Sequence, residues 1–533
     1  MTEEEKKIEE KEIHNVKAPR IGEKIKNWLK NPYNLSLLGI FLFAFIIRFY
    51  YFFITRDQPL WFDEGVYMSS AKSYAGIMDF QLESIRLPGY PLLMSAFFIL
   101  GINNEVVIRF IALFIPSLIV IFLTYLCIKE MYKDRRVALI STAIITVLWE
   151  HVFYSNRFHT ENFALIFQFL AFYLLFKVYL KKEEAFFIKP KYSLLIIALL
   201  SIISVIFRPG NMPFIPAIIL FVLWINKSHL LNKKYLISIV SLGVAAVLAF
   251  IFSERLQTLV SFYVNTQRPL AWSNLTVFHG FYQSVIPWLP SILFYFIIIG
   301  LILVLVDFFI NKKKLMHCKV DKEDLELKAD LFNFLLMISV FIIFIFLIRA
   351  QSFEYRWFFP LLTAMLVFTS KGIITTSNYI GYFLKNKKIV VLLILLVLGL
   401  GMYNQVLHAD GITKMKIDSY APVRDSGVWM KEHSSPEDTI VTASITQHAY
   451  YAERKVYDFY VNGSNENETK FNEEINENKP KYLVISSFEP GFTPQWAYDW
   501  PQRHNESAIP VQAFFADQEQ KQPLLIIYEL KWD

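Results

Sequence analysis

Long apolar blocks separated by short basic clusters constrain this sequence more than any other feature. An apolar block of about 20 residues is long enough to cross a lipid bilayer as a helix. Such blocks recur from residue 33 to residue 407, and 55% of the 533 residues are hydrophobic. An ordinary soluble domain does not carry this pattern, whereas a multi-pass membrane protein does.

The apolar blocks predict about eleven membrane-spanning helices. These helices are expected at 33–54, 105–128, 136–152, 158–180, 192–208, 210–226, 235–254, 287–310, 329–349, 356–375 and 388–407. The apolar run Tyr90–Gly101 has about 12 residues, which is too short for a span, and it is expected to lie as a helix in the membrane interface.

The composition changes after residue 407. Short β-rich runs at Thr439–Ala443, Tyr482–Ser486 and Leu524–Leu530 alternate with a helical stretch at Val423–His433 and with polar turns. This alternation is typical of a small α/β domain. The predicted fold class is therefore mainly α: a charged tail at 1–32, a polytopic membrane domain at 33–407 and a small α/β domain at 408–533.

The basic residues predict the orientation of the chain in the membrane. Lysine and arginine clusters occupy every second loop, and cytoplasmic loops are the ones enriched in these residues. The N-terminus of this cell-membrane protein is therefore expected in the cytoplasm, with 55–104, 149–157, 255–286 and the 408–533 domain outside. The net charge of +6 is spread over the loops rather than gathered on one face, so no nucleic-acid partner is expected.

Two adjacent carboxylates, Asp63 and Glu64, follow the first span within the aromatic stretch Trp61–Tyr67. A carboxylate at a bilayer boundary costs free energy unless water, a partner or a substrate compensates it. Asp63 also suits the N-cap of a helix that begins at Glu64, but capping explains neither the second acid nor the aromatic neighbours. We expect Asp63 to act as a catalytic base, with Glu64 as the second catalytic carboxylate.

The next segments supply candidate substrate-binding residues. In Arg86-Leu87-Pro88-Gly89-Tyr90-Pro91 a turn explains the prolines, whereas Arg86 suits a lipid headgroup or a sugar phosphate. Glu161 opens the otherwise apolar fourth span, which favours either a role in the site or stabilisation of the helix dipole. His159 has no second histidine at ligand spacing nearby, so a hydrogen-bonding role is expected rather than a metal site.

Three arginines at the outer ends of later spans, Arg208, Arg349 and Arg356, predict a cationic cluster. Arginines neutralise the charge that develops on a phosphate in a low-dielectric site. Snorkelling to the membrane surface is the alternative for Arg208. Tyr355, beside Arg356, fits either the site or an aromatic belt at the membrane surface.

These stretches, in this order, resemble the GT-C glycosyltransferases that use polyprenyl-phosphate sugars, most nearly the protein O-mannosyltransferases and the lipid A aminoarabinose transferase. The resemblance covers residues 33–375. It consists of an Asp-Glu pair after the first span, a segment with Pro-x-Tyr-Pro, an acid that opens the fourth span and an R-Y/W-x-x-P segment, matched here by Asp63-Glu64, Arg86–Pro91, Glu161 and Tyr355–Pro360. The WWDYG motif of the oligosaccharyltransferases is absent, since Trp496–Trp500 does not match it.

The resemblance implies an inverting transferase that moves one hexose or pentose, such as mannose in protein glycosylation of the cell envelope. The donor would be a dolichyl or undecaprenyl phosphate, and the acceptor a hydroxyl of a protein, glycan or lipid outside the membrane. Asp63 would take the acceptor proton, while Glu64 and Glu161 would orient the sugar or support Asp63. Members of this kind generally work without an obligatory metal, so none is expected; a divalent ion at Asp63 and Glu161 is the alternative.

Two other functions stay open at this point. A transporter or flippase of lipid-linked sugars needs charges at the membrane midplane and inverted repeats, but the acids lie at the outer boundary and the sequence has no evident repeat. The other alternative is a non-catalytic membrane assembly subunit with a sensing domain outside.

Overall fold

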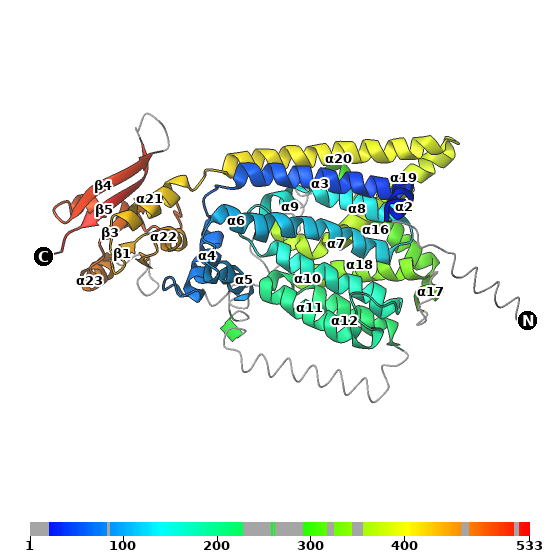
Figure 1. The fold of residues 1–533 in the computed structure, drawn as a ribbon, viewed down its shortest axis with the longest axis horizontal. Helices are drawn as coiled ribbons and strands as arrows, with labels where there is room; N and C mark the ends of the chain where they lie inside the picture. Colours follow the sequence, from blue (N-terminus) through cyan, green and yellow to red (C-terminus); the bar gives the residue numbers. More distant parts are fainter. Residues whose placement is uncertain are drawn as a thin grey trace, which may run out of the picture.

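The computed structural model describes residues 21–82, 86–227, 257–258, 261, 291–316, 324–343, 355–459, 468–515 and 522–532. The molecule is elongated (Figure 1). Helices α3 (Pro32–Thr55), α7 (Ile115–Met131) and α20 (Lys387–Lys416) run along its long axis, and a β-sheet lies at one end. The short helix α2 (Ile21–Leu29) lies at the opposite end.

Within the described residues, seven helices are long and apolar enough to cross a membrane. Two of them contain a π-helical turn: α6 (Glu105–Arg109) continues through Phe110–Phe114 into α7, and α10 (Glu161–Leu174) continues through Leu175–Leu180. The others are α3, α11 (Ser193–Phe207), α16 (Ser291–Ile310), α19 (Leu362–Phe383) with the 3-10 turn Tyr355–Leu361 before it, and α20.

Helices lie, wholly or in part, at every predicted span except 235–254, which falls outside the described residues. The span expected at 136–152 is divided into α8 (Arg135–Val147) and α9 (Trp149–Tyr154), because Leu148 between them leaves the helical conformation with ψ 112°. Two further spans are short helices, α12 (Phe214–Ile225) and α18 (Leu325–Phe341).

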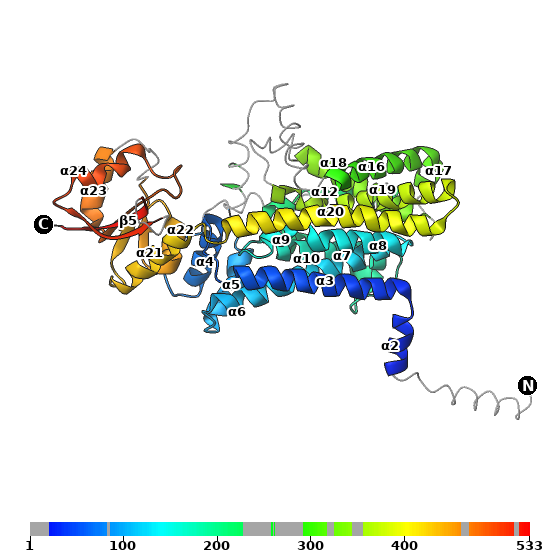
Figure 2. The same cartoon turned by 90° about the horizontal axis from the view of Figure 1, so that it is seen from above.

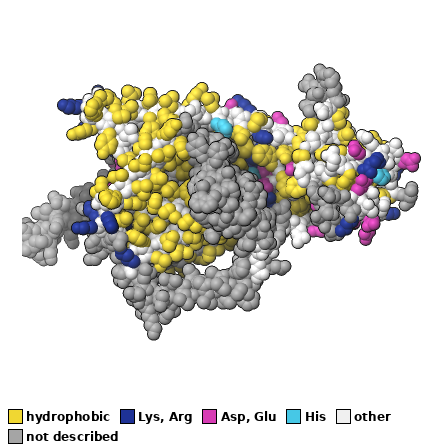
Figure 3. Space-filling view, turned by 180° about the vertical axis from the view of Figure 1, so that it is seen from behind, with side chains coloured by type: hydrophobic (Ala, Val, Ile, Leu, Met, Phe, Trp, Pro, Cys, Tyr) yellow, Lys and Arg dark blue, Asp and Glu magenta, His cyan; other side chains and the backbone are white. Residues whose placement is uncertain are grey.

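The surface of the bundle is mainly hydrophobic, and Lys and Arg side chains gather at the end away from the sheet (Figure 3). Glycines allow two of its helices to touch. A Cβ at Gly300 of α16 would collide with the Phe368 carbonyl of α19, and one at Gly372 of α19 would collide with the Phe296 carbonyl of α16. Small residues at such crossings let membrane helices pack closely.

Two short helices cap the end of the bundle that faces the sheet, α4 (Phe62–Tyr74) and α5 (Gly89–Ile99) (Figure 1). Helix α5 is the helix expected at Tyr90–Gly101. It also approaches α11 closely, since a Cβ at Gly89 would lie 2.8 Å from the carbonyl oxygen of Ile206.

Helix α20 continues past residue 408 to Lys416 and leads into the sheet region (Figure 2). Strands β1 (Thr439–Val441), β2 (Lys455–Tyr457), β3 (Tyr482–Ser486), β4 (Ala508–Phe515) and β5 (Pro523–Leu530) form one sheet in the order β2-β1-β3-β5-β4. Strand β1 is parallel to its two neighbours, while β5 is antiparallel to β3 and β4. Four helices accompany the sheet: α21 (Ala421–Glu432), α22 (Ile445–Ala452), α23 (Glu468–Asn478) and α24 (Trp500–Arg503).

Candidate active site

Glu64 fixes the start of α4 from inside the protein. Its carboxylate accepts hydrogen bonds from the backbone N–H of Trp61 at 2.8 Å, closing the first turn, and from the N–H of Phe158 at 2.7 Å. It also pairs with Arg157 at 3.0 Å and lies 4.0 Å from Arg109. Burial raises the pKa of Glu64, but these two arginines lower it further, so the group stays ionised.

The structure does not bring Glu64 to the cavity, and its expected catalytic role stays a prediction. Its side chain is fully buried and does not line the cavity described below. Through its bonds to Arg157 and to the N–H of Phe158, the Glu64 carboxylate connects α4 to the loop before α10. These contacts fix the start of α4, which also carries the neighbouring Asp63.

Helix α4 is also held by α22 from the C-terminal part of the chain. Thr446 donates a hydrogen bond to the carbonyl of Phe62 at 2.9 Å, and Ser69 donates one to the carbonyl of Thr446 at 2.9 Å. A Cβ at Gly65 would lie 2.6 Å from the Thr446 hydroxyl, so only glycine allows this approach. At the far end of α4, Lys72 pairs with Glu453 at 2.7 Å.

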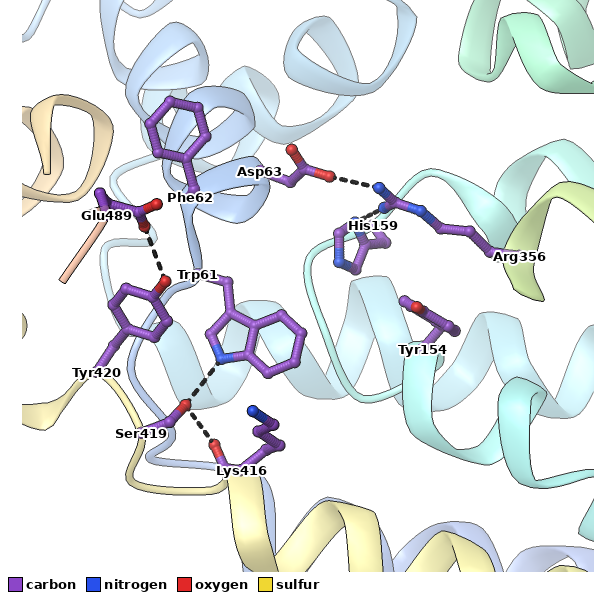
Figure 4. Close-up of a pocket in the computed structure, with 10 residues that line it drawn as sticks. All are labelled: Trp61, Phe62, Asp63, Tyr154, His159, Arg356, Lys416, Ser419, Tyr420 and Glu489. Carbon is purple, nitrogen blue, oxygen red and sulfur yellow. Dashed lines mark hydrogen bonds and ion pairs between the residues drawn. The ribbon is translucent and has the colours of Figure 1, made fainter. Parts of the chain in front are cut away.

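Asp63 lies between two arginines. Its Oδ1 is 2.7 Å from Arg86 Nη2, and its Oδ2 is 2.8 Å from Arg356 Nη2. The second guanidinium nitrogen of Arg356 lies 3.4 Å from Nδ1 of His159 (Figure 4). Burial raises the pKa of Asp63, but Arg356 and Arg86 outweigh burial and hold that pKa well below its ordinary value of 3.8.

A second set of buried side chains supports Arg356. Arg208 donates a short hydrogen bond to the backbone carbonyl of Arg356, and its side chain lies 3.5 Å from the carboxylate of Glu161. The same Glu161 oxygen is 4.0 Å from Arg356 Nη1. Neither Arg208 nor Glu161 lines the cavity, and both contact the lining residue Arg356.

The cavity beside Asp63 has a volume of about 350 Å³. Its walls come from three parts of the chain: the start of α4, the bundle, and the segment from the end of α20 into the sheet region (Figure 4). The lining residues are Trp61, Phe62, Asp63, Tyr154, His159, Arg356, Lys416, Ser419, Tyr420 and Glu489. Sequence reasoning missed Tyr154 and the four from the C-terminal part, because only the fold brings them to Asp63.

The remaining predicted residues lie as follows. Tyr90 is buried and packs edge-to-face on Tyr67, and the Tyr67 hydroxyl lies 3.3 Å from Arg86. Tyr90 therefore contacts the site only through Tyr67. Tyr355 is the first residue of the 3-10 turn that carries Arg356. Arg349 lies outside the described residues, so the predicted arginine cluster is seen here only as Arg208 and Arg356.

The carboxylates do not favour a bound cation. Both oxygens of Asp63 already face arginines, and Oε1 of Glu161 faces Arg208, so guanidinium groups compete with a cation for these oxygens. Within the described ranges, no group of three or more His, Cys, Asp or Glu side chains is placed to hold a metal ion.

Known proteins were compared with the chain by sequence and by structure. No family model and no curated protein matches the sequence. The Archaeoglobus fulgidus oligosaccharyltransferase, solved with a tethered acceptor peptide containing the NVT sequon, matches with a TM-score of 0.55 at 11% identity, over 95% of this chain and 75% of that chain.

ArnT from Cupriavidus metallidurans matches in two states. The apo structure gives a TM-score of 0.54 at 11% identity over 95% of this chain and 98% of that chain. The structure bound to undecaprenyl phosphate gives 0.50 at 10% identity over 92% and 97%. These likenesses show that the chain has the GT-C fold, as the sequence predicted.

Proposed function

We propose that the chain is an inverting glycosyltransferase that moves a single sugar from a polyprenyl phosphate to an acceptor hydroxyl outside the cytoplasm. The observation that carries the proposal is Asp63 held between Arg86 and Arg356 on the wall of the cavity. In the proposal, Asp63 is the base for the hydroxyl and the two arginines beside it are the cations for the phosphate. The fold supports it, since both matched proteins are transferases and one was solved with undecaprenyl phosphate.

The reaction is a single displacement. The acceptor oxygen attacks the anomeric carbon of the donor and forms the new C–O bond as the bond from that carbon to the phosphate oxygen breaks. The leaving electron pair stays on the phosphate, where Arg356 and Arg86 neutralise it. Asp63 accepts the proton of the acceptor hydroxyl, and inversion follows because no carboxylate forms a covalent intermediate.

The two arginines connect donor binding to the basicity of Asp63. In the free protein they keep the pKa of the carboxyl low, so the group is ionised but weakly basic. A donor phosphate competes for the same guanidinium groups, since arginine binds phosphate at least as well as carboxylate. Asp63 then loses part of its stabilisation and becomes a stronger base once the donor is present.

The cavity favours transfer of one sugar rather than a large glycan. Its volume of about 350 Å³ is near the lower limit for small-molecule sites. The aromatic rings of Trp61, Tyr154 and Tyr420 offer apolar faces against which a sugar ring can pack. A hexose and a pentose both suit this volume, and a dolichyl or an undecaprenyl carrier suits the apolar bundle beside it.

The proposed reaction assigns no metal to Asp63 and Glu161, because arginines already neutralise both groups. The proposed orientation places the cavity and the sheet outside and the N-terminus in the cytoplasm. Its support is the concentration of Lys and Arg at the bundle end opposite the sheet (Figure 3). Donor then enters from the outer leaflet, and a protein, glycan or lipid acceptor from the aqueous side.

The test is mass spectrometry of surface glycans and lipids from cells with and without the protein. It is paired with purified protein in nanodiscs that contain undecaprenyl- or dolichyl-phosphate sugars. The proposal expects one sugar added per acceptor and free polyprenyl phosphate released. A protein that moves these lipids across a bilayer without consuming them is a flippase, and that result would overturn the proposal.

A further inference from the structure

Glu489 brings a second carboxylate to the cavity from the sheet region. It lies in the turn that follows β3, with a left-handed φ of 52°. Its Oε1 accepts hydrogen bonds from the Tyr420 hydroxyl at 2.8 Å and from Gln447 Nε2 at 3.4 Å. Within the described part of the chain no cation pairs with Glu489, so it presents a net negative charge to the cavity.

The turn is built to hold this carboxylate in place. The backbone N–H of Phe492 donates to the carbonyl of Glu489 at 2.9 Å and closes the turn. The ring of Phe492 lies flat on the ring of Phe62, with centroids 5.4 Å apart and an interplanar angle of 9°. On the other side Phe488 packs on Tyr420 at 5.3 Å. A non-glycine residue in a left-handed conformation costs free energy, so surrounding contacts must maintain it.

Glu489 and Arg356 lie on different sides of Asp63. In Figure 4, Arg356 and His159 approach Asp63 from the bundle, whereas Glu489 and Tyr420 lie across the cavity next to Phe62. In the proposed reaction a donor phosphate binds on the side of Arg356. The opposite wall, formed by the chain after α20, is therefore the side from which an acceptor reaches Asp63.

The two carboxylates of the cavity, Asp63 and Glu489, differ in how far cations neutralise them. Two arginines neutralise Asp63, but the groups that bind Glu489 are the neutral side chains of Tyr420 and Gln447. Lys416 is the other charge on the C-terminal side, and it lies beyond Ser419 from Glu489 (Figure 4). The part of an acceptor next to Glu489 thus meets a carboxylate that accepts hydrogen bonds and repels anions.

We propose that Glu489 is a specificity-determining residue of the acceptor subsite, which favours an uncharged or cationic hydroxylated acceptor, such as a sugar, over an anionic one. This inference rests on the proposed function. It adds the charge class of the acceptor and the residue that selects it.

The test uses the full chain in nanodiscs with the polyprenyl-phosphate sugar that it consumes. Three acceptor probes share one ring and differ in charge: methyl glucoside, methyl glucosaminide and methyl glucuronide. The wild type is expected to prefer the first two over the glucuronide by about tenfold in kcat/KM. Glu489→Gln is expected to reduce this preference severalfold, and Glu489→Lys to reverse it in favour of the glucuronide.

The matched control is Glu477→Lys, which makes the same charge change at an exposed position on α23 and is expected to keep the wild-type preference. A preference that stays within about twofold of wild type in both Glu489 variants would overturn the inference. So would a wild type that consumes the donor but glycosylates none of the three probes. A wild type that consumes no donor at all would instead overturn the proposed function itself.

Discussion

The carboxylate of Asp63 and the guanidinium of Arg356 lie 2.8 Å apart, although 293 residues separate them in the chain. Asp63 belongs to α4, which caps the bundle, and Arg356 belongs to the turn that leads into α19. The pair joins the cap to the membrane bundle at the cavity. In the proposed reaction, the base and a phosphate-binding cation are thus in direct contact in the free protein.

Replacing Arg356 is expected to impair use of the donor. Arg356→Ala removes the cation that neutralises the leaving phosphate, and kcat/KM for the donor should fall by about 10²–10³. Arg356→Lys should recover only part of the loss. The planar guanidinium group can bind Asp63 and a phosphate at the same time, whereas the single ammonium group of lysine cannot. Steady-state kinetics with each substrate varied in turn will measure this, and equal losses for donor and acceptor would contradict the phosphate role.

The acidic limb of the pH–rate profile should move when Arg86 is replaced. Asp63 must be ionised to accept a proton, so activity falls as the pH drops through its pKa. The groups that set this pKa are Arg356, Arg86 and His159, all of which lower it against the effect of burial. Arg86→Ala removes one cation and raises the pKa, so the limb of kcat/KM should move upward by about one pH unit. An unmoved limb would show that another group controls it.

Replacing Glu64 is expected to destabilise the cap. Glu64→Gln leaves Arg157 buried without its carboxylate, while Arg109 keeps its ion pair with Glu105, and the expected cost is about 3–5 kcal/mol. Thermal unfolding in detergent or nanodiscs will measure it, with Glu477→Gln on the exposed face of α23 as the control. If Glu64→Gln is as stable as the control and only the chemical step is slow, Glu64 acts on the substrate rather than on the start of α4.

Gly65 is expected to tolerate no side chain. In Gly65→Ala the new Cβ meets the Thr446 hydroxyl at 2.6 Å and the Thr446 backbone at 2.9 Å, so α4 must move away from α22. A cost of about 1–3 kcal/mol is expected, and because Asp63 moves with α4, transfer should fall by about 10²-fold. Gly411→Ala is the control, since nothing lies within 4 Å of that position. Equal behaviour of the two variants would exclude the proposed docking.

The long helices were predictable because an apolar block of about 20 residues satisfies its backbone hydrogen bonds in a membrane by forming a helix. The break at Leu148 was not, because one residue leaving the helical conformation does not change the hydrophobic pattern. Nor was the short length of α12, which lies within a longer apolar block.

The candidate site was predictable in part. Charged residues stand out in a sequence when they lie next to apolar blocks. This contrast pointed to Asp63, Arg86, His159 and Arg356. The sequence named Asp63 as the base but could not show that Glu64 faces Arg157 inside the protein while Asp63 faces the cavity. Glu489 carries no signal of its own in the sequence, because only the packing of α22 and Phe492 against α4 brings its turn to the cavity.

The most direct test of the central claim is the single-turnover rate of sugar transfer by Asp63→Asn, with donor binding measured separately. The variant keeps the shape of the side chain and frees Arg86 and Arg356 for the donor phosphate. We expect donor binding to persist and the rate of transfer to fall by about 10³ or more. Transfer at the wild-type rate with normal donor binding would contradict the role of Asp63 as the base.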